Sequence, residues 1–323
     1  MPGRYEAFFL VGPTATGKSA VAQYLAEQDG AEILSADSML VYRGLDIGTA
    51  KPSRADRERV RYWGVDLVAP AEAFSVAQFL AVAGEAAHST AQAGRRLIVV
   101  GGTGLYIKAL LQGLAPLPET DPAARERWQA LLREGGTPAL QEALRARAPH
   151  WLTALADPNN GRRLVRALEL VEAGLTEPPA SFAAAAELPV VTGLLAGREV
   201  LESRIRGRVA AMYRDGLLDE VKRLIATSEL TAWPTAAQAL GYAEAVACLE
   251  GRLSEAEARD RTVIRTRQLA KRQMTWFRHQ GRVQWVEVAG EASVAQTAER
   301  VRQAWAAVGP TPLVLAPAGD EAK

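Results

Sequence analysis

Cysteine is nearly missing from this sequence. Cys248 is the only one among 323 residues, so the chain cannot form an internal disulfide. Small folds that depend on a disulfide framework are therefore excluded. A chain without disulfides suits a reducing compartment, and we expect a cytoplasmic protein.

Long apolar runs are missing as well. No stretch approaches the roughly 20 apolar residues of a transmembrane helix. The N-terminal segment has neither the apolar core nor the small-residue cleavage site of a signal peptide. We therefore expect no membrane segment and no secretory leader.

The chain also has little net charge, only +1, but its basic residues are concentrated in two places. The stretch 259–282 holds eight basic residues against the single acid Asp260, and a second set lies at 162–166. Local basic surfaces favour a polyanionic partner, although solvated helix faces have the same composition.

The N-terminal third alternates between short apolar runs and helical patterns. Three apolar strands separated by helices predict an α/β fold with a P-loop-type, doubly wound parallel sheet. The helix over 74–93 has Ser75 as its cap. The strands are expected at 8–11, 32–36 and 97–100, and the helices at 18–28 and 74–93.

The pattern changes after Gly113, where a proline-rich connection leads into helices over 121–174 with caps at Asp121 and Asp157. The simplest organisation is an α/β core of residues 1–113 and 184–323 with an inserted all-helical subdomain, 114–183. Beyond it we expect strands at 188–195 and 283–288, helices at 199–226, 236–249 and 255–280, and a frayed end at 309–323.

A phosphate-binding loop follows the first predicted strand. Residues 12–19 match G-x-x-x-x-G-K-[ST] throughout, as Gly12, Pro13, Thr14, Ala15, Thr16, Gly17, Lys18 and Ser19. We expect the N–H groups of 14–19 to converge on phosphate oxygens at the start of the next helix. Lys18 would reach the terminal phosphates, and Ser19 would ligate Mg²⁺. The position between a strand and a helix argues against a fortuitous glycine-rich turn.

The acid that most nucleotide-hydrolysing P-loop proteins place after a second apolar strand is missing here. Strand 97–100 ends in GGTGLY, whereas Asp37 follows strand 32–36. Asp37 would bind Mg²⁺ through water or act as a general base; the alternative is a turn cap. The glycines of 101–104 allow a ligand to approach the backbone closely, or serve a tight connection with positive φ.

Several segments together resemble the tRNA dimethylallyltransferase (isopentenyltransferase) family. The resemblance extends from Phe8 to about Val288, and the combination is far more specific than the P-loop alone. The segments are GPTATGKS (12–19), DSMLVYRGLDIGTAKP (37–52), GGTGLY (101–106), RRLVRALE (162–169), RIRGRVAAMYRDGLLDEV (204–221), ALGYAEA (239–245) and TRQLAKRQMTWFR (266–278).

This resemblance implies a reaction. The family transfers a dimethylallyl group from dimethylallyl diphosphate to the exocyclic N6 amine of the adenosine 3′-adjacent to the anticodon of tRNA. The P-loop then holds a diphosphate leaving group, with Mg²⁺ at Ser19. By the same resemblance, Asp37 accepts or orients the proton of the amine, while Lys18 and Arg208 neutralise the leaving group.

The resemblance also implies an RNA partner, the anticodon stem-loop of tRNA, bound by a protein that we expect to be monomeric. Arg163 and Arg166, at i and i+3 of a helix, would present one face to phosphates. For each surface arginine the alternative is a solvated residue or an intrahelical ion pair. The expected contacts are Asp37, Ser38, Met39, Leu40, Thr103, Arg125, Arg162, Arg163 and Arg166, with the basic helix 255–280 following the backbone. The inserted helical subdomain, 114–183, is therefore expected to bind tRNA.

The chain departs from the family pattern at a few positions. Leu40 stands where Gln is common, Tyr62 and Trp63 where a His pair is common, and Gly197 where an acid often precedes an arginine. The departures affect expected base contacts and local packing, and leave the diphosphate-binding residues unchanged.

Two other classes of function fit parts of the sequence. A P-loop kinase of a small metabolite would explain the P-loop and Asp37, but not the basic helices or the remaining segments. A non-catalytic RNA-binding module would explain the basic helices and leave Asp37 as a cap.

Overall fold

The computed structural model describes residues 5–115, 117–179, 187–227, 236, 239–290 and 292–315. The described chain divides into two compact units, Met1–Gly113 with Ala185–Lys323, and Leu114–Ala184. We call them the core unit and the inserted unit. The sequence predicted boundaries after 113 and 183, and the tRNA-binding role given to the inserted unit remains a prediction.

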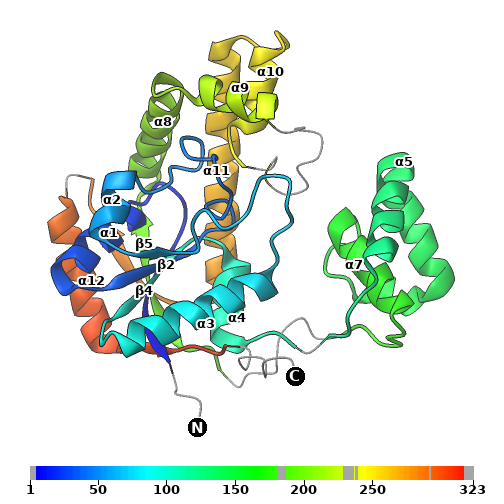
Figure 1. Ribbon diagram of the computed structural model, residues 1–323, viewed down its shortest axis with the longest axis horizontal. Helices are drawn as coiled ribbons and strands as arrows, with labels where there is room; N and C mark the ends of the chain where they lie inside the picture. Colours follow the sequence, from blue (N-terminus) through cyan, green and yellow to red (C-terminus); the bar gives the residue numbers. More distant parts are fainter. Residues whose placement is uncertain are drawn as a thin grey trace. The chain divides into compact units, whose positions relative to one another are not determined.

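The core unit is built on a parallel sheet with strand order β3-β2-β4-β1-β5-β6 (Figure 1). The predicted doubly wound α/β fold is therefore confirmed, because β2, β4, β1, β5 and β6 run parallel to one another in this order. The strands are β1 (Glu6–Val11), β2 (Glu32–Ala36), β3 (Tyr62–Trp63), β4 (Leu97–Gly101), β5 (Val190–Ala196) and β6 (Arg282–Val288).

Helices cover both faces of this sheet, so its central strands β2 and β4 are buried along their whole length. One face carries α1 (Lys18–Asp29) and α12 (Val294–Val308). Their buried residues Val21, Leu25, Val301 and Trp305 join one hydrophobic cluster with strand residues. The other face carries α3 (Val76–Gln92), α4 (Gly104–Gln112) and the end of α11 (Glu255–Gln280) (Figure 1).

A second hydrophobic cluster lies beyond the carboxyl ends of the strands. It joins the chain around Tyr42 and Leu45 to helices that follow β5. These helices are α8 (Arg198–Arg214), α9 (Leu217–Thr227), α10 (Tyr242–Leu249) and α11. The short α2 (Arg54–Arg59), earlier in the chain, has no buried residues. This cluster fixes the helices above the strand ends, where ligands of open α/β sheets bind.

The inserted unit has its own core of buried Trp128, Leu140, Leu144, Trp151 and Leu168. It consists of α5 (Pro122–Arg147), α6 (Pro149–Ala154) and α7 (Gly161–Glu172). α5 is kinked at Gly136, whose φ of 64° lies outside the helical region. A unit with a separate core is consistent with an insertion into the α/β unit.

Several sequence predictions require correction. Asp157 does not cap a helix: its side chain accepts the N–H of Asn159 in a turn, and Asn160 caps α7 instead. The predicted helix 199–226 is interrupted at Gly216, whose φ of 101° is left-handed. The helix expected from 236 begins only at Tyr242, after a left-handed Gly241.

The C-terminal segment was expected to fray from 309, and this is wrong for its described part. β7 (Thr311–Pro312) pairs antiparallel with β1, and the N–H of Val314 donates to Leu110 O at 2.7 Å. Residues 316–323 lie outside the described residues. Proline-rich composition did not prevent pairing, because Pro312 lies opposite Glu6, at the end of the β1–β7 ladder.

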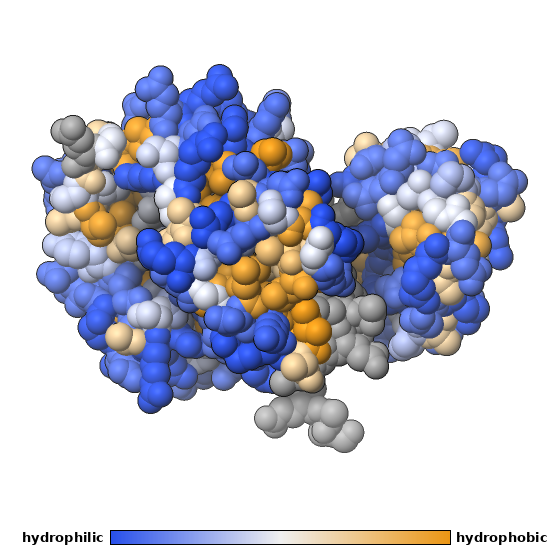
Figure 2. All heavy atoms as spheres, turned by 90° about the horizontal axis from the view of Figure 1, so that it is seen from above, coloured by the Kyte–Doolittle hydropathy of each residue, from blue (hydrophilic) through white to orange (hydrophobic). Residues whose placement is uncertain are grey.

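Polar residues cover most of the face of the two units seen in Figure 2, with smaller groups of hydrophobic residues between them. None of the helices in the described ranges combines the length and the apolar character needed to cross a bilayer.

Leu25 tests the packing of α1 on the sheet. Replacing this fully buried side chain by alanine should lower the free energy of unfolding by about 2–5 kcal/mol, because a cavity remains. Urea denaturation measures the change. Gln28→Ala, at an exposed position of the same helix, should stay within about 0.5 kcal/mol of the parent. Equal effects of the two substitutions would contradict this packing.

Candidate active site

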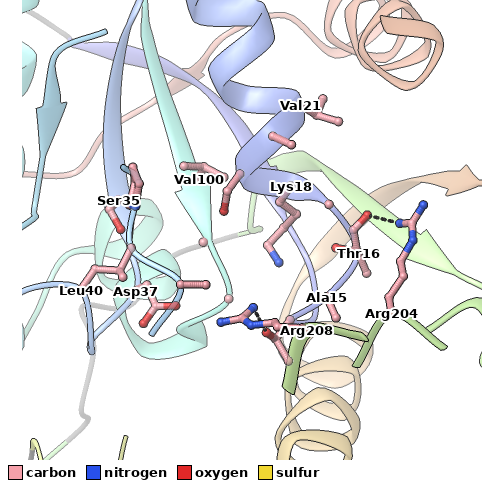
Figure 3. A pocket seen from close by; sticks show the side chains of 18 of the residues that line it. Ala15, Thr16, Lys18, Val21, Ser35, Asp37, Leu40, Val100, Arg204 and Arg208 are labelled. Carbon is pink, nitrogen blue, oxygen red and sulfur yellow. Dashed lines mark hydrogen bonds between the residues drawn. The ribbon is translucent and has the colours of Figure 1, made fainter. Parts of the chain in front are cut away.

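A cavity of about 440 Å³ lies at the carboxyl ends of β1, β2 and β4. These strands are neighbours, with Val11 and Ala36 both opposite Gly101. Their following loops therefore meet, although they are far apart in the sequence. Figure 3 shows Lys18, Asp37 and Arg208 extending toward the same space.

The P-loop has the backbone conformation of an anion-binding nest. Ala15 and Gly17 have φ of 65° and 93°, which turns successive N–H groups toward one side at the start of α1. Gly12 also has positive φ, and a Cβ there would lie 2.6 Å from Leu194 O. The loop is held from α8, because Arg204 donates to Thr16 O at 3.0 Å.

Thr14 differs from the prediction. Its N–H was expected to face phosphate, but it donates to Gln273 Oε1 of α11 at 2.8 Å. Its hydroxyl accepts a hydrogen bond from Arg208 Nη1 at 3.0 Å. The N–H of Thr14 is thus occupied, and the backbone donors left for a phosphate are those of residues 15–19.

Lys18 is buried, and its Nζ donates to Pro13 O at 2.6 Å. Burial lowers the pKa of Lys18 from its ordinary 10.5 to about 7. The carboxylate of Asp37 opposes this shift and the guanidinium of Arg208 adds to it. The ammonium therefore lacks sufficient negative charge around it, which an anionic ligand would supply.

Arg208 connects two loops. Besides Thr14, it donates through Nη2 to Thr49 O at 3.0 Å. Its Nε is buried and has no hydrogen-bond partner among the described residues. Burial lowers the pKa of Arg208, while Asp37 raises it. An arginine held at both ends with one unsatisfied donor suits an anionic ligand in this cavity.

Asp37 forms a turn cap at the edge of the cavity, and the base or Mg²⁺ role expected for it remains a prediction. It lines the cavity, and its Oδ1 also accepts the N–H of Met39 at 2.9 Å, as a turn cap does. The next N–H, of Ser38, donates to Thr103 Oγ1 at 3.1 Å. The β2 and β4 ends are thereby joined beside the carboxylate. Leu40 is buried and lines the same cavity.

The loop 45–52 closes one side of the cavity and is fixed by a buried acid. Glu220 of α9 accepts the N–H groups of Asp46 and Ile47 at 3.1 and 2.8 Å, and the hydroxyl of Tyr242 at 2.6 Å. Lys51 Nζ donates to Tyr42 O at 2.7 Å from inside the loop. Thr49 is positioned for Arg208 by these contacts.

The glycine-rich turn after β4 serves a purpose that neither sequence interpretation included. Neither Gly102 nor Gly104 has positive φ. A Cβ on Gly102 would lie 2.3 Å from Gln273 Nε2, and one on Gly104 would lie 2.2 Å from the indole of Trp276. The glycines leave room for side chains of α11, whose neighbouring Phe277 is fully buried.

In the inserted unit, two predicted RNA contacts share one acid. Glu169 has a fully buried side chain and binds Arg125 Nε at 2.5 Å and Arg166 Nη1 at 3.0 Å. Arg166 also donates to Thr120 Oγ1 at 3.1 Å. Arg162 and Arg163 are exposed on the same helix, α7.

The basic helix α11 is also partly paired. Arg265 binds buried Glu244 at 2.6 Å, and Arg267 lies 3.4 Å from Glu202. Lys271 and Arg272 are exposed. The ion-pair alternative therefore applies to Arg265 and Arg267, whereas Lys271 and Arg272 are exposed to solvent.

The donor set of the cavity fits Mg²⁺. Among the described residues no group of three or more His, Cys, Asp or Glu side chains is arranged to hold a metal. Ser19 and Asp37 both line the cavity, however, and present hard oxygen atoms. Mg²⁺ commonly takes one or two protein oxygens and completes its shell with water and substrate phosphates.

Sequence reasoning missed Gln273, Arg204 and Glu220. Gln273 carried a detectable signal, because it lies three residues after Ala270 and four before Phe277, both buried. A polar residue on the buried face of a helix requires hydrogen-bond partners. The partners themselves lie 259 and 171 residues away, beyond any local pattern.

Comparisons with known proteins give a consistent result. The IPP transferase family model matches residues 40–280, and an isopentenyl transferase model matches residues 5–73. The tRNA dimethylallyltransferase of Acidothermus cellulolyticus (strain ATCC 43068 / DSM 8971 / 11B) is 41% identical over 304 residues, which cover 92% of this chain and 93% of that protein.

Solved structures share the fold. The tRNA isopentenylpyrophosphate transferase of Bacillus halodurans is 33% identical, with a TM-score of 0.62 over 93% of this chain and 99% of that one. A eukaryotic dimethylallyltransferase acting on tRNA is 23% identical and has the same fold, with a TM-score of 0.71 over 93% of this chain and 77% of that one.

The lowered pKa of Lys18 predicts that the binding of diphosphate is coupled to the uptake of a proton. Bound phosphates should raise its pKa from about 7, so binding takes up a proton above that pH and weakens as the pH rises to 9. Calorimetry with inorganic pyrophosphate in buffers of different ionisation enthalpy measures the uptake. Protonation of pyrophosphate itself contributes to the measured uptake in every variant. Lys18→Met lacks the contribution of the lysine, so its proton uptake should be smaller than that of the parent. Equal uptake in both proteins would contradict the assignment.

Proposed function

Because this chain belongs to the IPP transferase family, we propose that it is a tRNA dimethylallyltransferase. It transfers a dimethylallyl group from dimethylallyl diphosphate to the exocyclic N6 amine of the adenosine 3′-adjacent to the anticodon, and releases diphosphate. The observation that carries the proposal is one cavity in which the P-loop, Lys18 and Arg208 face Asp37. Such a cavity can bind an anionic leaving group on its cationic side and contains a carboxylate that can accept a proton.

The leaving group interacts with the cationic side of the cavity. As the allylic C–O bond breaks, negative charge develops on the diphosphate. The N–H groups of 15–19, the Lys18 ammonium and the Arg208 guanidinium stabilise that charge. They are held in place beforehand by the protein, so little reorganisation accompanies the reaction.

The nucleophile belongs to the opposite side. The amine nitrogen forms the new C–N bond and loses a proton, which Asp37 accepts or orients. The adenine reaches the cavity by leaving the anticodon-loop stack, as target bases of nucleic-acid enzymes do. Ser38, Met39, Leu40 and Thr103 adjoin Asp37 and are assigned to the walls around that base.

Mg²⁺ is assigned to Ser19 Oγ, with Asp37 as the nearby carboxylate. The ion would neutralise charge on the diphosphate, and its remaining ligands would be phosphate oxygens and water. The chain's own donors bind and orient the diphosphate at the cavity wall.

The inserted unit is assigned to tRNA binding. Arg162 and Arg163 are exposed on α7, and Arg125 and Arg166 of the same unit pair with buried Glu169. A shared buried acid fixes two guanidinium groups and leaves their outer N–H groups for phosphate oxygens.

A direct assay distinguishes this function from the kinase that a P-loop alone permits. The protein is incubated with labelled dimethylallyl diphosphate and total tRNA, the tRNA is digested, and nucleosides are analysed for prenylated adenosine. ATP-dependent phosphorylation of a small molecule without tRNA prenylation would overturn the proposal.

Asp37→Asn tests the proton acceptor. The amide retains the Oδ1 acceptor for Met39 N–H but accepts no proton, so kcat should fall by about 10²- to 10⁴-fold. Filter binding should give a tRNA Kd close to that of the parent. Asp215→Asn, in an exposed pair with Arg214, serves as the control with unchanged kcat. Full activity of Asp37→Asn would leave Asp37 as a turn cap only.

Arg163→Ala tests the RNA surface of the inserted unit. Loss of one phosphate contact should weaken tRNA binding and reduce the slope of log K against log salt by about 1. Titrations at several salt concentrations measure that slope. Arg145→Ala, whose side chain pairs with Glu142, is the matched control in the same unit. An unchanged slope in Arg163→Ala would remove this residue from the interface.

A further inference from the structure

Gln273 is the one side chain of α11 that hydrogen-bonds to both glycine-bearing loops of the cavity. Its Oε1 accepts the N–H of Thr14 at 2.8 Å, and its Nε2 donates to Gly102 O at 3.1 Å. The amide orientation follows from these partners, because one offers only a donor and the other only an acceptor.

These two hydrogen bonds join loops that belong to different parts of the reaction. Thr14 belongs to the loop that holds the diphosphate, whereas Gly102 precedes Thr103, whose hydroxyl meets Ser38 beside Asp37. Gln273 is therefore the link between the leaving-group side and the nucleophile side. β1 and β4 bring these loops together, but their pairing ends at Val11 and Gly101.

The fit between Gln273 and the β4 loop is tight. A Cβ on Gly102 would lie 2.3 Å from Nε2 and 3.0 Å from Cδ of Gln273. One turn further along α11, the indole of Trp276 occupies the space above Gly104 in the same way. α11 therefore contacts the β4 loop through two side chains, of which Gln273 also reaches the P-loop.

We propose that Gln273 is a positioning residue that fixes the spacing between the diphosphate cradle and the Thr103–Asp37 side of the cavity. The inference rests on the proposed function. Gln273 acts through the backbone of Thr14 and Gly102, and the cradle keeps its phosphate donors at 15–19 without it. Misplacement of reacting groups by about 1 Å can reduce a rate by about 10²-fold.

The test compares Gln273→Met with Gln268→Met in the full-length protein. Methionine keeps the approximate length and removes both hydrogen bonds; Gln268 lies on the exposed side of the same helix. We expect Gln273→Met to lose about 10- to 100-fold in kcat for tRNA prenylation. Its affinity for inorganic pyrophosphate, its tRNA affinity and its melting temperature should remain near those of Gln268→Met.

Pyrophosphate affinity separates the two possible roles of Gln273. If Gln273 merely supported the structure of the P-loop, its replacement would lower this affinity together with kcat. Three outcomes would overturn the proposal: a loss of less than threefold in kcat, a matching loss of pyrophosphate affinity, or a melting temperature reduced enough to explain the loss. The parent protein is assayed in parallel. A parent that does not prenylate tRNA sinks the proposed function itself, whereas an active parent with an equally active Gln273→Met sinks only the role of Gln273.

Discussion

The guanidinium of Arg208, with its buried Nε, makes the contacts on which the cavity depends most. It joins the P-loop at Thr14 to the loop 45–52 at Thr49, and α8 carries it to that point from beyond the strand ends. Its charge lies near Lys18, so two cations share one space with Asp37 as their nearby acid. Cations kept together without enough counter-charge make the site favourable for an anion and costly to leave empty.

The central strands of the sheet and the long helix α11 followed from local patterns, because apolar runs, caps and the P-loop act over a few residues. β1, β2, β4 and the full extent of α11 were predictable in this way. β3, β7 and α12 were not expected: the two strands contain only two residues each and owe their pairing to neighbours. The fold class therefore followed from the sequence, and its edges did not.

Three residues that line the cavity could be named from the sequence, but the contacts that arrange them could not. Lys18, Asp37 and Arg208 came from a motif and a resemblance, and they line one cavity. The hydrogen bonds that arrange them, from Gln273 to Thr14 and from Glu220 to Asp46, join segments separated by 259 and 174 residues. Tertiary packing decides such contacts. The same holds for Arg125, whose pairing with buried Glu169 no local pattern predicts.

Gly104 has no side chain, and the space that a side chain would occupy is taken by the indole of Trp276 on α11. Its backbone is ordinary, so what excludes a larger residue is the indole of Trp276 and not the conformation of the turn. Positions 104 and 276 should therefore change together over evolution, a larger residue at one being tolerated with a smaller residue at the other. A redesign that places a side chain at position 104 would therefore have to reduce the residue at 276 as well.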